Sequence, residues 1–325
     1  PDSMSRGLGQ AISEFAPLSR IRNEHVLYES RGISGILTPT GQNRFYAPSG
    51  EPYTRANHAV FCNNCDILVT MLELGDDINS VECQVCGDLK DVVEDSMPDL
   101  QCIAPSMFIT NPYGIARGDG ITDRFGEQTT RTSARAGLFH EGASGLVCNH
   151  NQTNLVSEFH ESGEVFRMNL GPGQRGFKLS SPSSWFGQPL PNVWLIDDSN
   201  ADPDNNQNHW GLMAPRITEV VRVRPSKTPI GLVIDPRLPG EERNQEDTSR
   251  ARGAIISASA LIQRVFADYS DIDPGELAIG HLRRCVLNDG TYGGEILFYD
   301  DNDNGGSGFS SQLEAELIKI LNRSV

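Results

Sequence analysis

The sequence predicts an α+β fold that is rich in antiparallel sheets, has few helices and carries an inserted zinc ribbon. Three observations support this class. The 325 residues include 32 glycines and 19 prolines, which indicates many turns between short elements. Several short stretches alternate apolar and polar residues, as half-buried strands do. Two closely spaced cysteine pairs lie in the first third of the chain.

The two cysteine pairs, Cys62-Asn-Asn-Cys65 and Cys83-Gln-Val-Cys86, form a C-x2-C-x17-C-x2-C pattern. This spacing predicts a tetrahedral zinc site, because each short turn directs two thiolates toward one ion. Four sulfur ligands leave no open coordination position, so we expect a structural ion, about one per chain, rather than an ion that activates water. The alternative is a set of buried or disulfide-bonded cysteines.

The length of the chain favours two subdomains, since domains average about 150 residues. We expect an N-terminal segment at residues 1–135, with the ribbon at about residues 58–90, and an α+β domain at residues 136–325. The sequence opens on Pro1 and a helical pattern runs close to Val325. We therefore expect a piece of a longer polypeptide, truncated at the C-terminus.

The elements of the first half follow from local patterns. We expect a short helix at residues 7–15, a hairpin at 20–37, a strand that places Ile67, Val69 and Met71 on one face, a solvated acidic loop at 88–99 and an irregular region at about 105–136.

The second half alternates short strands with polar loops. We expect strands at residues 136–139, 146–149, 154–159, 164–169, 217–224, 230–234, 277–282 and 295–299. Residues 182–208 predict a long surface insertion, and residues 236–250 a polar loop. Apolar residues at helical spacing predict a helix at 254–269. A final helix at 312–322 is expected to start from a capping box of Ser311 and Glu314.

The charge of the chain argues against autonomous DNA binding. A net charge of −16 repels a phosphate backbone over most of the surface. A local basic strip is still present around one predicted strand, and it consists of Arg216, Arg222, Arg224 and Lys227. Its side chains either contact nucleic acid or a partner, or form a solvated strand face. Phe309, beside a glycine-rich loop, is a further candidate for such a contact surface.

The composition predicts a reduced, cytoplasmic protein. Three of the seven cysteines, Cys102, Cys148 and Cys285, lack partner spacing, which fits a compartment without disulfides. No apolar stretch approaches the length of a membrane span. We therefore expect no membrane partner.

Three further patterns resemble functional motifs. Gly171-Pro-Gly-Gln-Arg-Gly176 matches a dinucleotide fingerprint but leads into prolines instead of a helix, so a hairpin turn is the preferred interpretation. Cys148, His150 and His160 offer metal ligands without a fourth at motif spacing, which favours a core cysteine and surface histidines. Asp300, Asp301 and Asp303 could hold a divalent ion in a hydrolase or nuclease.

The order of several segments resembles the helicase-associated region of superfamily 2 DNA helicases, in particular the MrfA-type zinc-binding domain. That domain occurs in repair helicases and in antiphage systems of the DISARM and Druantia kind. Besides the cysteine pairs, the segments that carry the resemblance are Ile12 to Pro17, Val26 to Ile33, Arg167 to Gly171 with Gly176-Phe177, Arg216 to Glu219, Pro274 to Leu277, and Ile296 to Asp300 before Gly305 to Gly308.

The resemblance implies an accessory zinc module beside an ATP-driven DNA translocase, with helicase motor domains as partners, in the same chain or in a separate subunit. It implies contact with DNA through the complex and a role in antiviral defence or DNA repair. Members of this family usually carry a further cysteine cluster after the glycine-rich segment, and this chain ends before one. The alternative is the metal-dependent hydrolase or nuclease with Asp300, Asp301 and Asp303.

Overall fold

The structure is a computed structural model. It describes residues 6–23, 26–40, 45–62, 65, 67–73, 80–83, 85–91, 100–110, 135–140, 145–150, 153–171, 176–180, 192–196, 209–236, 245–301 and 307–323. These residues form many strands and three α-helices, which confirms the predicted α+β class. No helix in the described ranges is long and apolar enough to span a membrane.

A long strand, β16 (His209–Pro225), is the centre of the fold. It forms backbone pairs with β13 (Leu155–Asn169), β14 (Phe177–Ser180), β9 (Leu100–Pro105) and β19 (Tyr292–Asp300). Two runs of four consecutive residues in β16, 211–214 and 220–223, are buried. Successive strand residues point to opposite faces, so both faces of β16 are covered by protein at these positions.

The remaining strands extend this sheet in both directions. Toward the ribbon, β9 pairs with β5 (Tyr53–Cys62), and β5 pairs with β6 (Ile67–Glu73). Beyond β14, the sheet continues through β15 (Val193–Ile196) to β2 (Val26–Ser34), which also pairs with β1 (Arg20–Asn23) and β10 (Met107–Thr110). On the other side, β11 (Arg135–His140) and β12 (Leu146–His150) pair with β13, and β17 (Leu277–Ile279) and β18 (Arg283–Val286) pair with β19.

Two small hairpins lie outside the large sheet, β3 (Ile36–Thr40) with β4 (Phe45–Ser49), and β7 (Ser80–Glu82) with β8 (Leu89–Asp91). Among the described strand pairs, β9 and β16 alone run parallel, and the others are antiparallel as predicted. The β9–β16 pair also crosses the expected boundary near residue 135. The division into two subdomains stays a prediction.

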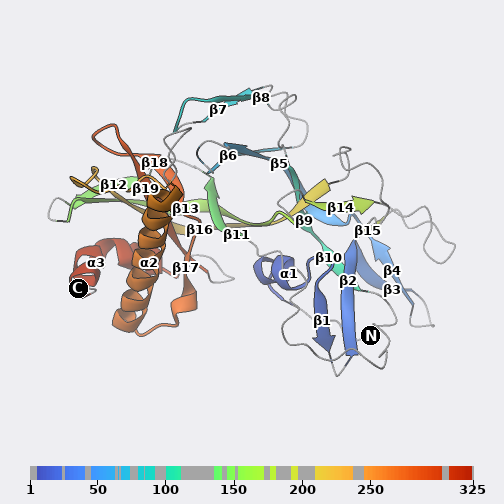
Figure 1. Ribbon diagram of the computed structural model, residues 1–325. Coiled ribbons are helices and arrows are strands. Elements are labelled where there is room, and N and C mark those ends of the chain that lie inside the picture. Colours follow the sequence, from blue (N-terminus) through green and yellow to red (C-terminus); the bar gives the residue numbers. More distant parts are fainter. Residues whose placement is uncertain are drawn as a thin grey trace.

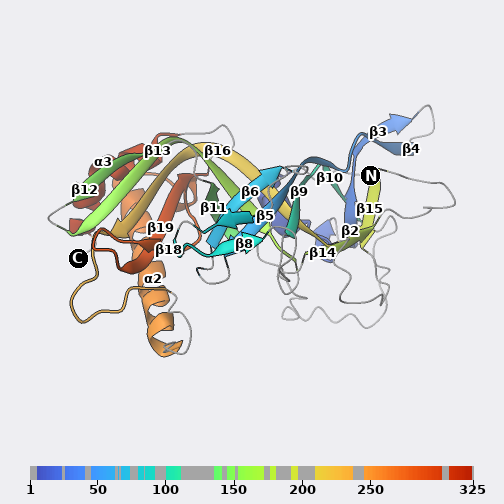
Figure 2. The ribbon, with the colours of Figure 1, turned by 90° about the horizontal axis from the view of Figure 1, so that it is seen from above.

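The helices cover separate parts of the sheet (Figures 1 and 2). α2 (Gln245–Ser270) and α3 (Phe309–Arg323) pack on β16 and β19 over a core that includes Phe266, Phe298 and Leu317, and the 3-10 turn η5 (Pro274–Glu276) follows α2. α1 (Leu8–Glu14) buries Ile12 against β2, β9, β14 and β16. Figure 2 shows β13 and β16 running along the molecule between these two parts.

Several predicted elements differ in extent from the observed ones. Residues 154–159 and 164–169 belong to one strand, β13, because the β13–β16 ladder continues across a register shift between His160 and Gly163. The predicted surface insertion at 182–208 contributes β15 to the sheet, where it pairs with both β2 and β14. The predicted strand at 277–282 forms only over residues 277–279, as β17, and a separate strand, β18, begins after it at Arg283. The two strands pair with different parts of β19.

Other predictions are wrong in kind. Residues 230–234 form no strand, and Ile230, Leu232 and Val233 are exposed. α2 begins at Gln245, inside the stretch that the polar composition assigned to a loop. Met107–Thr110 and Leu89–Asp91 form strands within regions expected to be irregular. The rest of those regions, residues 92–99 and 111–134, lies outside the described residues.

The start of α3 also differs from the predicted capping box. The helix begins at Phe309, and the carboxylate of Asp300 accepts hydrogen bonds from Phe309 N at 3.1 Å and Ser310 N at 2.8 Å. Ser310 Oγ donates to the same carboxylate at 2.6 Å. A residue at the end of β19 therefore satisfies the free N–H groups that Ser311 was expected to serve.

We expect Phe266→Ala to lower the free energy of unfolding by about 3–5 kcal/mol, because the side chain is fully buried in the α2 core. Ile256→Ala on the same helix is the control, since Ile256 is 52% exposed and should change stability by no more than about 1 kcal/mol. Urea unfolding followed by circular dichroism measures both. Equal losses in the two variants would contradict the observed packing of α2.

Candidate metal centre

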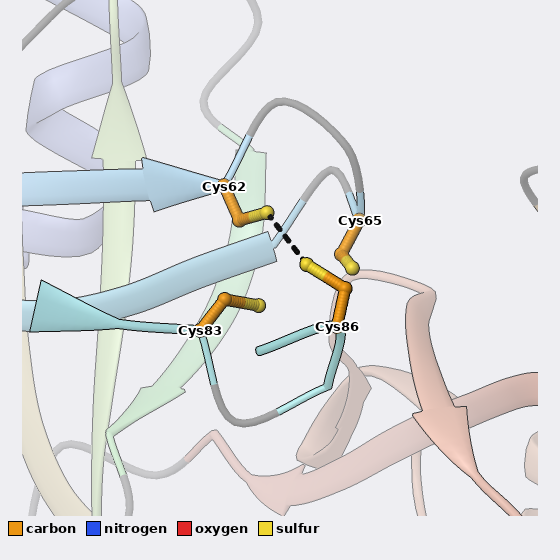
Figure 3. Close-up of side chains that lie close together, drawn as sticks. All are labelled: Cys62, Cys65, Cys83 and Cys86. Atoms are coloured by element: carbon orange, nitrogen blue, oxygen red, sulfur yellow. Dashed lines mark hydrogen bonds between the residues drawn. The ribbon is translucent and has the colours of Figure 1, made fainter. Parts of the chain in front are cut away.

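The four predicted ligands converge at the ends of two hairpins (Figure 3). Cys62 ends β5 and Cys65 lies in the turn before β6, while Cys83 and Cys86 lie in the turn between β7 and β8. All four Sγ atoms lie within 4.8 Å of one another, and the side chains point toward a common centre. The ribbon strands are thus arranged as the C-x2-C spacing predicts.

The spacing of the sulfur atoms fits a tetrahedral ion. Cys62 Sγ and Cys86 Sγ are 3.7 Å apart, and no cysteine is in a disulfide. Zn–S bonds of about 2.3 Å in a tetrahedron put two sulfurs about 3.8 Å apart. A disulfide would need about 2.05 Å. The arrangement therefore fits a metal ion and excludes a disulfide between these two cysteines.

The turn after β7 is built for a metal ligand. Gly87 has φ +70° and donates from its N–H to Cys83 O at 2.8 Å, and Cys83 N donates to Asp88 O at 2.9 Å. The positive φ is a conformation that glycine adopts without steric cost. Backbone N–H groups of Cys86 and Val85 also contact Cys83 Sγ. These N–H groups favour a thiolate at Cys83.

The cysteines differ in how readily they ionise. A hydrogen bond from Cys62 lowers the pKa of Cys83 to about 5. The same hydrogen bond, together with burial, raises the pKa of Cys62 well above its usual value. Burial is the main cause that raises the pKa of Cys65 to about 12. A metal ion would have to displace protons from Cys62 and Cys65, so metal binding should weaken as the pH falls.

Arg284 connects this centre to the C-terminal part of the sheet. The residue is 3% exposed, and its side chain contacts Cys65 Sγ from Nη1 at 3.9 Å. It donates from Nη2 and Nε to the Asp235 carboxylate at 2.7 and 3.0 Å. The guanidinium also lies 3.8 Å from the centroid of the Tyr292 ring. A zinc ion with four thiolates has a net charge of about −2, and a buried guanidinium compensates part of it. No local pattern in the sequence marks Arg284 or Asp235 as neighbours of the cysteines.

The predicted basic strip is largely engaged in ion pairs. Arg222 is 8% exposed and lies 2.7 Å from Glu158 Oε1. The hydrogen bond with His160, together with the contact with Arg222, lowers the pKa of Glu158 to about 2, although burial acts in the opposite direction. Glu295 also faces the Arg222 guanidinium, and its Oε1 lies 3.6 Å from Arg222 Nη1. Arg222 is therefore buried and paired within the protein, and its contact with nucleic acid or a partner stays a prediction.

The other candidate contact residues lie in different surroundings. Arg216 forms an ion pair with Asp301, with 2.6 Å between Nη1 and Oδ1. Arg216 and Arg167 both line a cavity of about 430 Å³. Arg224 donates to Val286 O at 3.2 Å. Lys227 is exposed, whereas Phe309 packs partly buried against the α2–α3 core. Contact of these residues with nucleic acid or a partner stays a prediction.

Two of the three acids of the alternative site have structural partners. Asp300 is fully buried and caps α3, and Asp301 pairs with Arg216. Asp303 lies outside the described residues. Within the described ranges, Asp300 and Asp301 belong to no group of three ligand-type side chains. The capping role of Asp300 leaves its carboxylate oxygens engaged with Phe309 and Ser310.

Comparisons with known proteins give one match. No family model and no curated protein matches the chain. A search of solved structures matches the crystal structure of the DUF1998 helicase MrfA bound to DNA, with a TM-score of 0.29 and 8% identity. The match covers 59% of this chain and 19% of that one, so the chain spans about a fifth of the length of the helicase.

We expect Cys62→Ser to lose the ion of the four-cysteine centre and to lower the thermal unfolding temperature by several degrees, because a structural metal contributes folding free energy. Metal content per chain, measured by mass spectrometry of the purified protein, checks the loss. Cys102→Ala is the control, since Cys102 is buried outside the cluster. A Cys62→Ser protein with unchanged metal content would contradict the site.

We expect Arg284→Leu to lower the free energy of unfolding by about 3–5 kcal/mol, because it leaves the Asp235 carboxylate buried without its partner. Arg264→Leu is the matched control, since Arg264 is 65% exposed in its pair with Asp268 and should cost about 0.5 kcal/mol or less. Urea unfolding of both variants gives the comparison. Similar losses would show that the Arg284 contact contributes little.

Proposed function

We propose that the chain is an accessory, zinc-binding module of a superfamily 2 DNA helicase system that acts in antiphage defence or DNA repair in the cytoplasm. The ion of the four-cysteine centre is zinc, held by Cys62, Cys65, Cys83 and Cys86. The module has no motor of its own. It positions helicase motor domains, in the same polypeptide or in another subunit, and it meets DNA through that complex.

The observation that carries this proposal is a set of buried hydrogen bonds between segments that resemble the family. Asn169, fully buried, donates from Nδ2 to Ile12 O at 2.7 Å. Thr218, 2% exposed, donates from Oγ1 to Asp300 O at 3.0 Å. Each bond joins two of the resembling segments, over sequence separations of 157 and 82 residues.

A third bond extends the same pattern. Ser30, fully buried, donates from Oγ to Phe15 O at 2.7 Å and so connects β2 to the end of α1. Buried polar groups are costly unless they are paired, so these side chains are required for this particular arrangement of segments. These bonds thus hold the stretches on which the resemblance rests against one another. This coincidence supports a shared domain rather than a chance similarity of short motifs.

The chemistry of the centre supports a structural role for the metal. Four thiolates fill a tetrahedral coordination sphere and leave no position for water or substrate. The Cys65–Arg284 contact further encloses it. The net charge of −16 and the paired arginines of β16 argue that DNA binding belongs to the complex and not to this chain alone. The proposed partners are therefore basic or mixed surfaces of motor domains.

The test uses the natural assembly, isolated through an affinity tag on this chain. We expect DNA-stimulated ATP hydrolysis in the assembly and none in the separated chain. A Cys62→Ser, Cys83→Ser double variant should lose most of the co-purified motor, because the ribbon no longer folds around its ion. Ser80→Ala, an exposed change at the start of β7, is the control that should retain it.

Two outcomes would overturn the proposal. One is an assembly without an ATP-driven motor. The other is DNA cleavage by the isolated chain with Mg²⁺ or Mn²⁺ that Asp301→Asn and Asp303→Asn abolish while circular dichroism stays unchanged. The second outcome would favour the hydrolase or nuclease alternative. Asp300→Ala is unsuitable here, because it also removes the cap of α3.

A further inference from the structure

A second group of metal-ligand side chains lies far from the ribbon in sequence. Cys148 and His150 occupy alternate positions of β12, and alternate strand residues lie on the same face. Glu314 on α3 meets them there. The ligand atoms of Cys148, His150 and Glu314 all lie within 4.8 Å of one another. Sulfur, nitrogen and oxygen donors from a strand and a helix thus converge at one point.

A buried serine orients two of these three groups. Ser157 on β13 is the cross-strand partner of Cys148 and is fully buried. Its Oγ donates to Glu314 Oε1 at 3.1 Å and lies 2.8 Å from His150 Nε2. The hydroxyl has one hydrogen, so with Glu314 as its acceptor it accepts from His150 Nε2–H. In the neutral imidazole, the lone pair of Nδ1 is then available for a ligand.

Two nearby predictions about these side chains differ from the structure. His160, the ligand that the sequence suggested beside Cys148 and His150, is buried and contacts Glu158 at 3.0 Å. Cys148 is exposed and is in no disulfide. Glu314 was expected to cap α3, but Asp300 caps the helix instead, and the Glu314 carboxylate faces the sheet, where it accepts from Ser157. The interpretation of a core cysteine and surface histidines is therefore wrong for Cys148 and for His160.

We propose that Cys148, His150 and Glu314 form a second metal site, for a divalent ion of the zinc class. One thiolate, one imidazole and one carboxylate match the donors that zinc accepts, and magnesium or calcium would prefer oxygen alone. The hydrogen bond between Ser157 and the second nitrogen of His150 fixes the orientation of the ring, as outer-shell partners of metal-binding histidines do. Three protein ligands leave a fourth position open to water or to another donor.

The position of the site would let a bound ion connect an edge strand of the sheet to α3. Among the described strands, β12 pairs with β13 alone and is an edge of the sheet. An ion held by Cys148, His150 and Glu314 ties this edge to α3. Since Cys148 is exposed, the ion exchanges with solvent more readily than one in the enclosed four-cysteine centre. This site does not depend on the proposed helicase role.

The test measures protection of Cys148 in the full chain, with its four-cysteine centre loaded. After brief dialysis against a mild chelator, the protein is exposed to iodoacetamide with and without added Zn²⁺, and modified peptides are counted by mass spectrometry. We expect zinc to slow alkylation of Cys148 by about tenfold or more, because a coordinated thiolate is a poor nucleophile. Equilibrium dialysis should show one more zinc per chain in the wild type than in Cys148→Ser.

Variants on α3 give the matched comparison. Glu314→Gln should remove the protection of Cys148 and the additional zinc, while Glu316→Gln on the same helix should keep both. His150→Gln provides a second ligand variant if Glu314→Gln unfolds α3, as circular dichroism would reveal. Equal alkylation with and without zinc in the wild type would overturn the site. So would identical zinc binding in the wild type and in folded Cys148→Ser and His150→Gln.

Discussion

The backbone hydrogen bonding of β16 is the constraint on which the rest of the structure depends. A strand has two edges, and every buried N–H and C=O on them needs a partner. In β16, β13 satisfies one edge along most of its length, and β9, β14 and β19 share the remainder. Because β9 lies in the first third of the chain and β19 near its C-terminal end, this one strand fixes the ribbon side relative to the helical side.

The pairing of β16 also fixes the positions of the strands that surround the metal centre. The β5–β6 hairpin carries Cys62 and Cys65, and it reaches β16 through β9. β18 carries Arg284 and reaches β16 through β19. The charge-assisted contact between Arg284 and Cys65 therefore joins two parts of the sheet that, among the described strand pairs, are otherwise connected through β16. The ribbon is therefore attached to the sheet at both ends and differs from a freestanding zinc finger.

Several charged side chains in this protein make structural contacts in its interior. Asp300 caps a helix, Asp235 holds Arg284, and Glu158 pairs with Arg222. The Asp235 and Glu158 contacts connect elements that are distant in sequence. A carboxylate with two or three hydrogen-bond donors is poorly suited to bind a catalytic ion as well. Asp300, Asp235 and Glu158 are therefore committed to structural contacts.

The sequence by itself determined the features that depend on neighbouring residues. The spacing of Cys62, Cys65, Cys83 and Cys86 predicted their convergence, and apolar periodicity predicted the strand of Ile67 and the core face of α2. The tertiary structure alone decided the rest. Strand β15 forms within a polar segment because β2 and β14 complete its hydrogen bonds, and Ile230 is exposed because no strand pairs with its segment. Arg284 meets Cys65 across 219 residues, and Glu314 meets Ser157 across 157. Local periodicity cannot predict contacts between residues so far apart in sequence, because only the register of the folded sheet brings these residues together.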